Sequence, residues 1–231
     1  MTIRIITEPT VAVIGRMSFD RDALQPYLDS IGAGGWQTDA ESGGDALAET
    51  AGRICYRSFA TPRPGGNAAY LERIKSEGHG SVCEHAYFSL LLTGISRNLT
   101  HEFVRHRAGF AYSMRSQRYC DDSDIGFVVP PALLPFKVDY DAWAEGDCED
   151  PALEGPFNVW VESCEDASLA YSQMLVDFGP TKTTADRKAA REAARSVLPG
   201  CTATELVVTG NGRAWRHWLE MRGSAHAEAE I

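Results

Sequence analysis

The chain has 231 residues, of which 44% are hydrophobic and 23% are charged, as in ordinary globular proteins. Its formal net charge of −10 argues against long nucleic acids and anionic membranes as partners, because both attract positive charge. No apolar run is long enough to cross a membrane, and the first residues lack the pattern of a secretory signal. The six cysteines include no CxxC pair, which favours free thiols. We therefore expect a single cytoplasmic domain over residues 1–231.

The N-terminal part predicts one strand, a glycine-rich polar stretch without a site, and two helices. Helical patterning covers residues 45–59 and stops at the segment TPRPGG. Residues 67–77 then predict a short amphipathic helix, with Gly78 as its C-terminal cap.

The middle of the chain predicts a buried strand followed by a helix. Residues 86–95 (AYFSLLLTGI) are apolar and partly β-branched or aromatic, which is typical of such a strand. Ser96 is expected to cap a helix over residues 97–106, because a serine hydroxyl accepts from the free N–H groups of a first turn. A polar loop is expected from there through Tyr119.

The C-terminal part begins with an acidic segment. Residues 121–166 hold thirteen Asp or Glu and one Lys, which predicts a solvated, partly irregular stretch. Helical patterning returns near residues 157–178, and Thr184 is expected to cap a further helix that Pro199 stops. The strand ELVVTG and a helical run from Gly212 to Ile231 complete the chain.

Positive charge is concentrated between Thr100 and Tyr119. Four arginines and two histidines stand there against one acid, Glu102, in an otherwise acidic protein. Arginine presents paired donors that match phosphate oxygens and stays charged at every relevant pH. The cluster is therefore either a pocket for phosphate, diphosphate or a flavin, or a surface face that pairs with the acidic segment.

Three more polar clusters have two interpretations each. GHGSVCEH, residues 78–85, matches no familiar zinc spacing, so we expect no metal there. Its glycines permit a ligand to approach the backbone, but Ser81 also suits an ordinary turn cap. The other two clusters lie on predicted helices, where a solvated face is the alternative to a site: Arg187, Arg191 and Arg195; and Asn211, Arg213, Arg216, His217 and Arg222.

Three common motifs of nucleophilic catalysis and nucleotide binding are absent from the sequence. There is no GxSxG, no GxxxxGK[ST] loop and no GxGxxG fingerprint, so a flavin, if bound, is not held by a Rossmann unit. Two other functions stay open: a non-catalytic nucleotide or RNA sensor that uses the arginines, and a metal-dependent nucleotide hydrolase that uses His79, Cys83, Glu84 and His85.

Taken in chain order, the clusters resemble the flavin-dependent thymidylate synthase (ThyX) family. The hallmark of this family is an RHR triplet, a short spacer and Ser-x-Arg-Tyr, which stands here as Arg105-His106-Arg107, AGFAYSMR and Ser116-Gln117-Arg118-Tyr119. GRICYRS (52–58), GHGSVCEH, AREAARSVLP (190–199) and Asn211-x-Arg213 with Arg222 also match. The resemblance covers residues 45–231 and is weakest over 121–180.

The resemblance implies an α/β (α+β) fold with a mixed or mainly antiparallel sheet and long helices. It also implies a homotetramer whose sites lie between subunits. The implied reaction is reductive methylation of carbon 5 of a uracil nucleotide, UMP or dUMP. FAD is the implied cofactor, NADPH the reductant and methylenetetrahydrofolate the one-carbon donor.

The resemblance also implies a role for individual residues. Arg195 and Ser116 are the catalytic candidates; Arg195 would polarise the pyrimidine, and Ser116 would be a binding donor rather than a nucleophile. The implied FAD contacts are His79, Ser81, Glu84, Arg105, His106, Arg107, Asn211, Arg213 and His217. The implied nucleotide contacts are Glu102, Arg105, Ser116, Gln117, Arg118, Arg195 and Arg222.

Two departures from the family pattern fall near the implied nucleotide site. Glu102 stands where the family usually has Gln, and the spacer after the RHR triplet is one residue longer than usual. A carboxylate accepts hydrogen bonds from ribose hydroxyls, and an extra residue can make room for one. These departures predict that UMP is accepted as well as dUMP, as in the branch of the family that serves nucleoside-antibiotic (polyoxin) biosynthesis.

Overall fold

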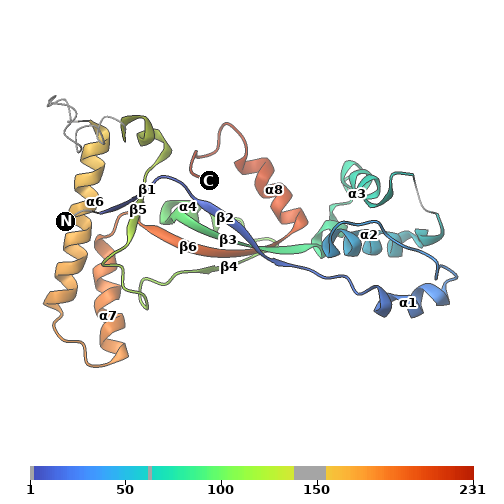
Figure 1. Ribbon diagram of the computed structural model, residues 1–231, viewed down its shortest axis with the longest axis horizontal. Helices are drawn as coiled ribbons and strands as arrows, with labels where there is room; N and C mark the ends of the chain where they lie inside the picture. Colours follow the sequence, from blue (N-terminus) through green and yellow to red (C-terminus); the bar gives the residue numbers. More distant parts are fainter. Residues whose placement is uncertain (1–2, 62–63, 138–154) are drawn as a thin grey trace.

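A four-stranded antiparallel sheet forms the middle of the molecule (Figure 1). The computed structural model of the protein describes residues 3–61, 64–137 and 155–231. The strand order is β2-β3-β6-β4, and the strands are β2 (Thr10–Arg16), β3 (Tyr87–Ser96), β6 (Ala203–Asn211) and β4 (Phe110–Met114). The central strands β3 and β6 are rich in apolar residues, and Leu206 and Val208 are fully buried.

Helices α6 (Pro156–Asp177) and α7 (Thr184–Ala194) lie at one end of the sheet (Figure 1). A second, parallel pair of strands packs beside them, β1 (Arg4–Ile6) with β5 (Gly126–Val128). The core at this end joins Phe127 of β5 to Phe157 and Cys164 of α6. A 3-10 turn, Arg195–Val197, follows α7, and another, Pro131–Leu133, follows β5.

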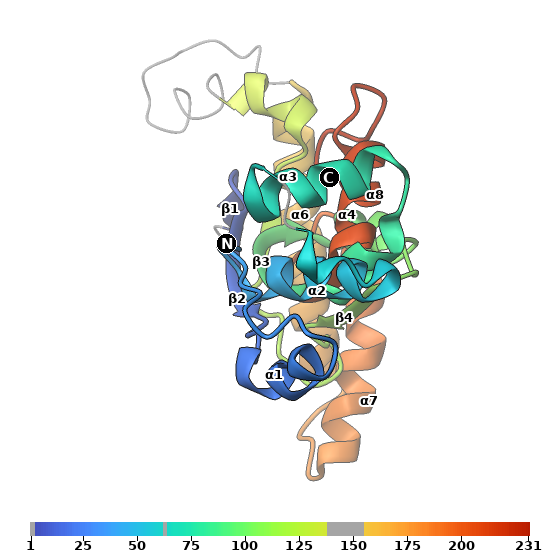
Figure 2. The ribbon, with the colours of Figure 1, turned by 90° about the vertical axis from the view of Figure 1, so that its right-hand side faces the viewer.

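The opposite end of the molecule carries three helices, α1 (Arg21–Ser30), α2 (Gly43–Tyr56) and α3 (Gly66–Ser76) (Figures 1 and 2). Two 3-10 turns complete it, Ser58–Ala60 and Gly80–His85. Gly78 has a φ of +75° and ends α3, because its N–H bonds to the carbonyl of Lys75.

Helices α4 (Arg97–Phe103) and α8 (Gly212–Arg222) are held to the sheet by aromatic side chains. Phe103 of α4 stacks on Trp218 of α8, with their ring centroids 4.8 Å apart. Trp215 stacks on Phe88 of β3 at 5.3 Å. This cluster fixes the start of α8 against the sheet, and with it the residues that precede the helix.

The structure confirms the α/β class, the mainly antiparallel sheet and most of the predicted elements. Ser96 does cap α4, because its hydroxyl accepts from the N–H of Leu99, although α4 ends at Phe103 rather than at residue 106. The cap of α7 is Thr183 rather than Thr184, and it forms a capping box with Asp186. No helix among the described residues is long and apolar enough to cross a membrane.

Three further expectations were wrong. The expected polar loop before Tyr119 contains the strand β4, which pairs with β6 through backbone hydrogen bonds. The acidic segment is not solvated throughout, because Ile125 and Val129 are buried; its residues 138–154 lie outside the described part. The last helix ends at Arg222 instead of Ile231, because Gly223 follows it and donates to the carbonyl of Leu219.

Candidate active site

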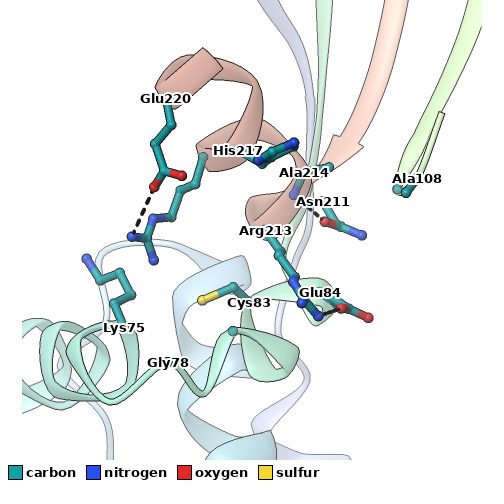
Figure 3. Close-up of a pocket in the computed structure, with 13 residues that line it drawn as sticks. Lys75, Gly78, Cys83, Glu84, Ala108, Asn211, Arg213, Ala214, His217 and Glu220 are labelled. Atoms are coloured by element: carbon teal, nitrogen blue, oxygen red, sulfur yellow. Dashed lines mark hydrogen bonds and ion pairs between the residues drawn. The ribbon is translucent and has the colours of Figure 1, made fainter. Parts of the chain in front are cut away.

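A cavity of about 680 Å³ lies where α8 begins and faces the 3-10 turn Gly80–His85 (Figure 3). Its polar lining residues come from α3, from that turn and from α8: Lys75, Glu84, Asn211, Arg213, Arg216, His217 and Glu220. The other lining residues are small: Gly78, Gly80, Cys83, Ala108, Gly109 and Ala214. The cavity therefore combines charged groups with exposed backbone. Sequence reasoning assigned four of its members to a site, Glu84, Asn211, Arg213 and His217, and assigned none of the other three polar residues: Lys75, Arg216 and Glu220.

Asn211 fixes the first turn of α8 at the cavity. Its side chain is buried, and its oxygen accepts from the N–H of Ala214 at 2.8 Å. Gly109 packs against this cap with a φ of +81°, and a Cβ there would lie 2.7 Å from the amide nitrogen of Asn211. Glycine is therefore required at position 109, and the positive end of α8 opens towards the cavity.

An ion pair spans the cavity between Arg213 of α8 and Glu84 of the 3-10 turn, with Nη1 and Oε1 2.6 Å apart (Figure 3). The two side chains are 61% and 46% exposed, so water competes for both groups. A pair of this kind is weak, and Arg213 can turn towards an anionic ligand at little cost.

The RHR triplet follows α4 and meets the end of α8. Arg222 Nε donates to His106 Nε2 at 2.9 Å, and the rings of His106 and His217 are 6.5 Å apart. Partial burial, reinforced by the positive charge of Arg222, lowers the pKa of His106 below its ordinary value. The imidazole is therefore held neutral, because its Nε2 accepts a hydrogen bond.

Glu102 is shared between two arginines. Its carboxylate lies 3.0 Å from Arg105 Nη1 and 3.0 Å from Arg222 Nη2. The hydrogen bond from Arg105 is the main reason that the pKa of Glu102 is lowered, and Arg222 adds to it. Arg107 is exposed, and no ion pair to it is formed among the described residues.

The remaining predicted nucleotide contacts lie at the other end of the sheet. Ser116, Gln117 and Arg118 follow β4, whose last residue, Met114, is paired with Leu206 of β6. β6 then runs from Leu206 to Asn211, which is roughly 17 Å at about 3.3 Å per residue. Figure 1 shows α7 at one end of the sheet and α8 over the sheet, starting from its other end. Within one chain, the predicted residues therefore form two groups and not one site.

The group beside α7 is tied to that helix by polar contacts. Arg118 Nε lies 2.7 Å from Glu192 of α7, and Arg191 Nη1 donates to the carbonyl of Tyr119 at 2.7 Å. Gln117 is buried. Arg195 begins the 3-10 turn after α7, is exposed, and forms no ion pair with a described residue.

His79 and Ser81 line a neighbouring hollow of about 310 Å³, together with Cys55, Tyr56 and Arg213. This hollow adjoins the main cavity, because both are lined by Gly78, Gly80 and Arg213, and we refer to the two together as one groove. In the described part of the chain, no three His, Cys, Asp or Glu residues are grouped to hold a metal ion. Glu84, one of the residues proposed for a metal hydrolase, is instead paired with Arg213.

Comparison with known proteins decides the family. Residues 38–231 match the family described as "Thymidylate synthase complementing protein". The chain is 48% identical over 207 residues to the flavin-dependent thymidylate synthase of Mycobacterium sp. (strain KMS), a match that covers 85% of this chain and 74% of that protein. The identity to the enzyme of Mycobacterium tuberculosis (strain ATCC 25177 / H37Ra) is 44% over 203 residues, with the same coverage. This chain belongs to the flavin-dependent thymidylate synthase family.

A solved structure shares the fold of this family member. The UMP/dUMP methylase PolB from Streptomyces cacaoi, crystallised with 5-Br UMP, aligns with a TM-score of 0.61 over 99% of this chain and 86% of that chain, at 21% identity. The comparisons confirm the predicted family and the methyltransferase class. The family implies FAD as cofactor, with a folate and NADPH as co-substrates.

The cavity at the start of α8 fits a flavin dinucleotide. Such a ligand needs positive donors for its diphosphate and a smooth surface for its ring, and it is held outside a Rossmann unit in this fold. The N-terminus of α8 supplies positive charge, and Arg213 and Lys75 add donors whose present partners, Glu84 and Glu72, are exposed carboxylates that a phosphate can replace. Gly109 and Ala108 leave the wall beside Asn211 free of large side chains.

Proposed function

We propose that this protein catalyses the reductive methylation of carbon 5 of a uracil nucleotide, with FAD as cofactor, NADPH as reductant and methylenetetrahydrofolate as one-carbon donor. The observation that carries the proposal is the cavity at the start of α8, which joins three cationic side chains, two carboxylates and the positive end of a helix in a chain of this family. Bound FAD supplies the redox chemistry that no side chain provides. The role of the protein is to bind FAD and the nucleotide, to orient them towards each other and to polarise the pyrimidine ring.

The flavin is assigned to the α8 end of the molecule. Asn211 and Arg213 present donors from the first turn of α8, and Glu84 and His217 complete the cavity walls. His79 and Ser81 extend the same groove. The RHR triplet lies beside it, with His106 6.5 Å from His217 between ring centroids. These residues, with Arg105 and Arg107, are our proposed cofactor set.

The nucleotide is assigned to the group beside α7. The exposed guanidinium of Arg195 forms no ion pair with a described residue, so it is available to polarise a pyrimidine carbonyl. The hydroxyl oxygen of Ser116 accepts from the N–H of Arg118 at 3.4 Å, and no described carboxylate or imidazole bonds to this hydroxyl. A serine without a base is a poor nucleophile, which supports the role of binding donor.

The separation of the two groups supports a site between subunits. A chain that carries its proposed flavin residues at one end, and Ser116, Arg118 and Arg195 at the other, needs a second copy to bring them together. Exposed apolar residues on β2 and α6 suit such contacts: Val11 is 64% exposed, Val176 70% and Leu169 59%. We propose the homotetramer of the family, with each site built from different subunits.

Subunit mixing tests this assembly. Arg107→Ala disables the α8 group and Arg195→Ala the α7 group, and each variant alone is expected to be nearly inactive. Co-refolding the two in equal amounts combines intact groups from different chains, so roughly a quarter of the sites recover activity if assembly is random. If the mixture stays as inactive as its parents, the shared site is wrong. Light scattering gives the assembly mass independently.

The sugar of the nucleotide, ribose in UMP or deoxyribose in dUMP, is the part of the substrate that is still to be assigned. The relatives at 48% and 44% identity are thymidylate synthases, whereas the likeness to PolB concerns the fold. The carboxylate of Glu102 already holds Arg105 and Arg222, which leaves it less able to receive a ribose hydroxyl. We therefore propose dUMP as a substrate, and acceptance of UMP stays a prediction from the sequence.

Two measurements test the function. The purified protein is expected to be yellow, with flavin absorbance near about 450 nm, and to transfer a methyl group to dUMP when all co-substrates are present. A colourless protein that binds no added FAD overturns the proposal. Comparison of kcat/KM for UMP and dUMP, on wild type and Glu102→Gln, decides the sugar. A preference for dUMP above about a thousandfold exceeds the cost of one unpaired hydroxyl and rules out UMP.

A further inference from the structure

A second hollow lies behind His79, between α2, α3 and the 3-10 turn Ser58–Ala60. Its volume is about 340 Å³. We call it the tail pocket and define it by Arg53, Tyr56, Tyr70, Arg73 and His79. Two of these residues belong to the GRICYRS segment, to which neither the flavin nor the nucleotide assignment gives a role. Figure 2 shows α2 and α3 close together at this end of the molecule.

Arg53 is a buried cation at the base of the tail pocket. The residue is 4% exposed, and its Nε donates to Glu49 at 2.7 Å while its Nη1 donates to the carbonyl of Ser58 at 2.8 Å. Glu49 is fixed in turn by Thr38 and Asn67. Arg53 Nη2 has no hydrogen-bond partner among the described residues. A rigid guanidinium with a spare donor beside a hollow is suited to an acceptor from a ligand.

Aromatic rings form the walls of the tail pocket. Tyr70 lies against Arg53, with the guanidinium carbon 4.7 Å from the ring centroid. Tyr56 and His79 stack at 6.3 Å with their planes 21° apart. Gly52 makes room for Tyr70, because a Cβ at position 52 would lie 2.5 Å from the tyrosine hydroxyl. Walls of this kind accept a planar ring.

The tail pocket lies next to the groove assigned to the flavin. Tyr56 and His79 line both the tail pocket and the 310 Å³ hollow, and that hollow shares Arg213 with the main cavity. A ligand in the tail pocket can therefore be the distal part of a molecule whose other end reaches the flavin.

We propose that the tail pocket binds the p-aminobenzoyl-glutamate portion of the folate co-substrate, an inference that rests on the proposed function. The aryl ring lies between the tyrosines, and a carboxylate reaches Arg53 Nη2 and Arg73. NADPH also combines aromatic rings with negative charge, but its phosphates need more positive charge than this pocket has. Arg53 shares its charge with Glu49, and Arg73 shares its charge with Glu77, 2.6 Å away.

The first test is direct binding. p-Aminobenzoyl-L-glutamate is titrated calorimetrically into the purified protein and into Arg73→Ala. Arg73 is 43% exposed and its ion pair is on the surface, so the fold should tolerate the change. We expect binding to weaken by about tenfold, as for loss of one partly exposed charge-assisted contact. Arg187→Ala is the control, since it removes an exposed arginine of α7 that lines neither cavity.

The second test separates the possible occupants. In Arg73→Ala, and in Tyr70→Leu, which removes one ring wall, KM for methylenetetrahydrofolate should rise about tenfold. KM for NADPH and the bound flavin content should stay within twofold of wild type, by the same reasoning. An equal rise in KM for NADPH, or loss of flavin, assigns the pocket to those molecules and overturns the inference. So does wild-type protein that fails to bind p-aminobenzoyl-L-glutamate.

The two proposals fail separately. If the protein methylates no uracil nucleotide but binds p-aminobenzoyl-L-glutamate in an Arg73-dependent way, the proposed function falls and the pocket assignment stands. If methylation occurs and Arg73→Ala leaves both binding and KM for the folate unchanged, the proposed function stands and the pocket assignment falls.

Discussion

The two ends of the central sheet hold their arginines in different ways. At the α7 end, Arg115 is 23% exposed and lies 2.9 Å from Asp122, which is 2% exposed. At the α8 end, Arg105 and Arg213 are 69% and 61% exposed and pair with carboxylates that water also reaches. Buried charges must be matched within the protein, whereas exposed pairs contribute little to stability. Arg115 is therefore held by the fold, whereas Arg105 and Arg213 are free to be reoriented by a ligand.

Asp122→Ala should cause the largest change, because it leaves Arg115 without its buried partner. Oδ1 of Asp122 lies within ion-pair distance of Arg115, although not in the alignment of a hydrogen bond. We expect a loss of about 2–4 kcal/mol in the free energy of unfolding, measured with urea on flavin-free protein. The matched change at the other end, Glu84→Ala, should cost less than about 1 kcal/mol. If the two variants lost equal free energy of unfolding, the pair at the α7 end would be no more important for stability than the pair at the α8 end.

Arg107→Ala tests the α8 end by function. Arg107 is exposed and forms no ion pair in the described part of the chain, so its removal should leave the fold intact. We expect FAD binding to weaken by about 2–3 kcal/mol, as for loss of a charge-assisted contact. Gel filtration with detection of flavin absorbance measures retention. A variant that stays as yellow as wild type contradicts the assignment.

Ser116→Ala tests the α7 end by function and should have a smaller effect. Loss of one neutral donor lowers kcat/KM by roughly tenfold at most, whereas loss of a nucleophile abolishes turnover. Methylation by FAD-loaded variant is compared with wild type at saturating dUMP. Complete inactivity with the nucleotide still bound would show that Ser116 does more than bind.

Thr183→Ala tests how much the N-terminal capping box of α7 contributes to stability. The Thr183 hydroxyl accepts from the N–H of Asp186 at 3.1 Å, and the Asp186 carboxylate accepts from the N–H of Thr183 at 3.0 Å. Loss of this capping box should cost about 1 kcal/mol in urea denaturation. Thr184→Ala is the control, because the Thr184 hydroxyl accepts from the exposed Arg187 and caps no backbone N–H among the described residues. If Thr184→Ala lost more free energy of unfolding than Thr183→Ala, Thr184 would be the N-cap, as expected from the sequence.

Local patterns predicted the fold well where one pattern filled an element. The continuous apolar run of β3 and the Ser96 cap of α4 are examples. β4 was missed because FAYSM is short and is stabilised by pairing with β6, a contact far away in sequence. Burial of Phe127 was missed because the composition of a long acidic window hid a short apolar strand. Tertiary pairing decides such cases, and composition does not record it.

The candidate site was predicted residue by residue but not in space. Asn211, Arg213 and His217 do line one cavity, because consecutive turns of one helix share a face. The distance between Ser116 and this cavity follows from the register of β4 on β6, which the chain order does not show. Lys75 and Tyr70 were missed because no motif marks them; they are placed by the packing of α3 on α2.

The smallest effect we predict is a pH dependence of the contact between His106 and Arg222. The neutral imidazole accepts a hydrogen bond from Arg222 Nε. Protonation of His106 Nε2 would place its N–H opposite the N–H of Arg222 Nε, and the hydrogen bond would be lost. Partial burial and then the charges of Arg222, His217 and Arg105 lower the pKa of His106, and the carboxylate of Glu102 opposes them. A histidine whose pKa is lowered by folding contributes stability above its unfolded value, about 6.5, and loses it as the pH falls below that value.

Urea denaturation of wild type and His106→Gln at pH values on either side of about 6.5 measures the difference. Wild type should lose more stability than His106→Gln on acidification, and parallel losses would show that Arg222 does not hold His106 neutral.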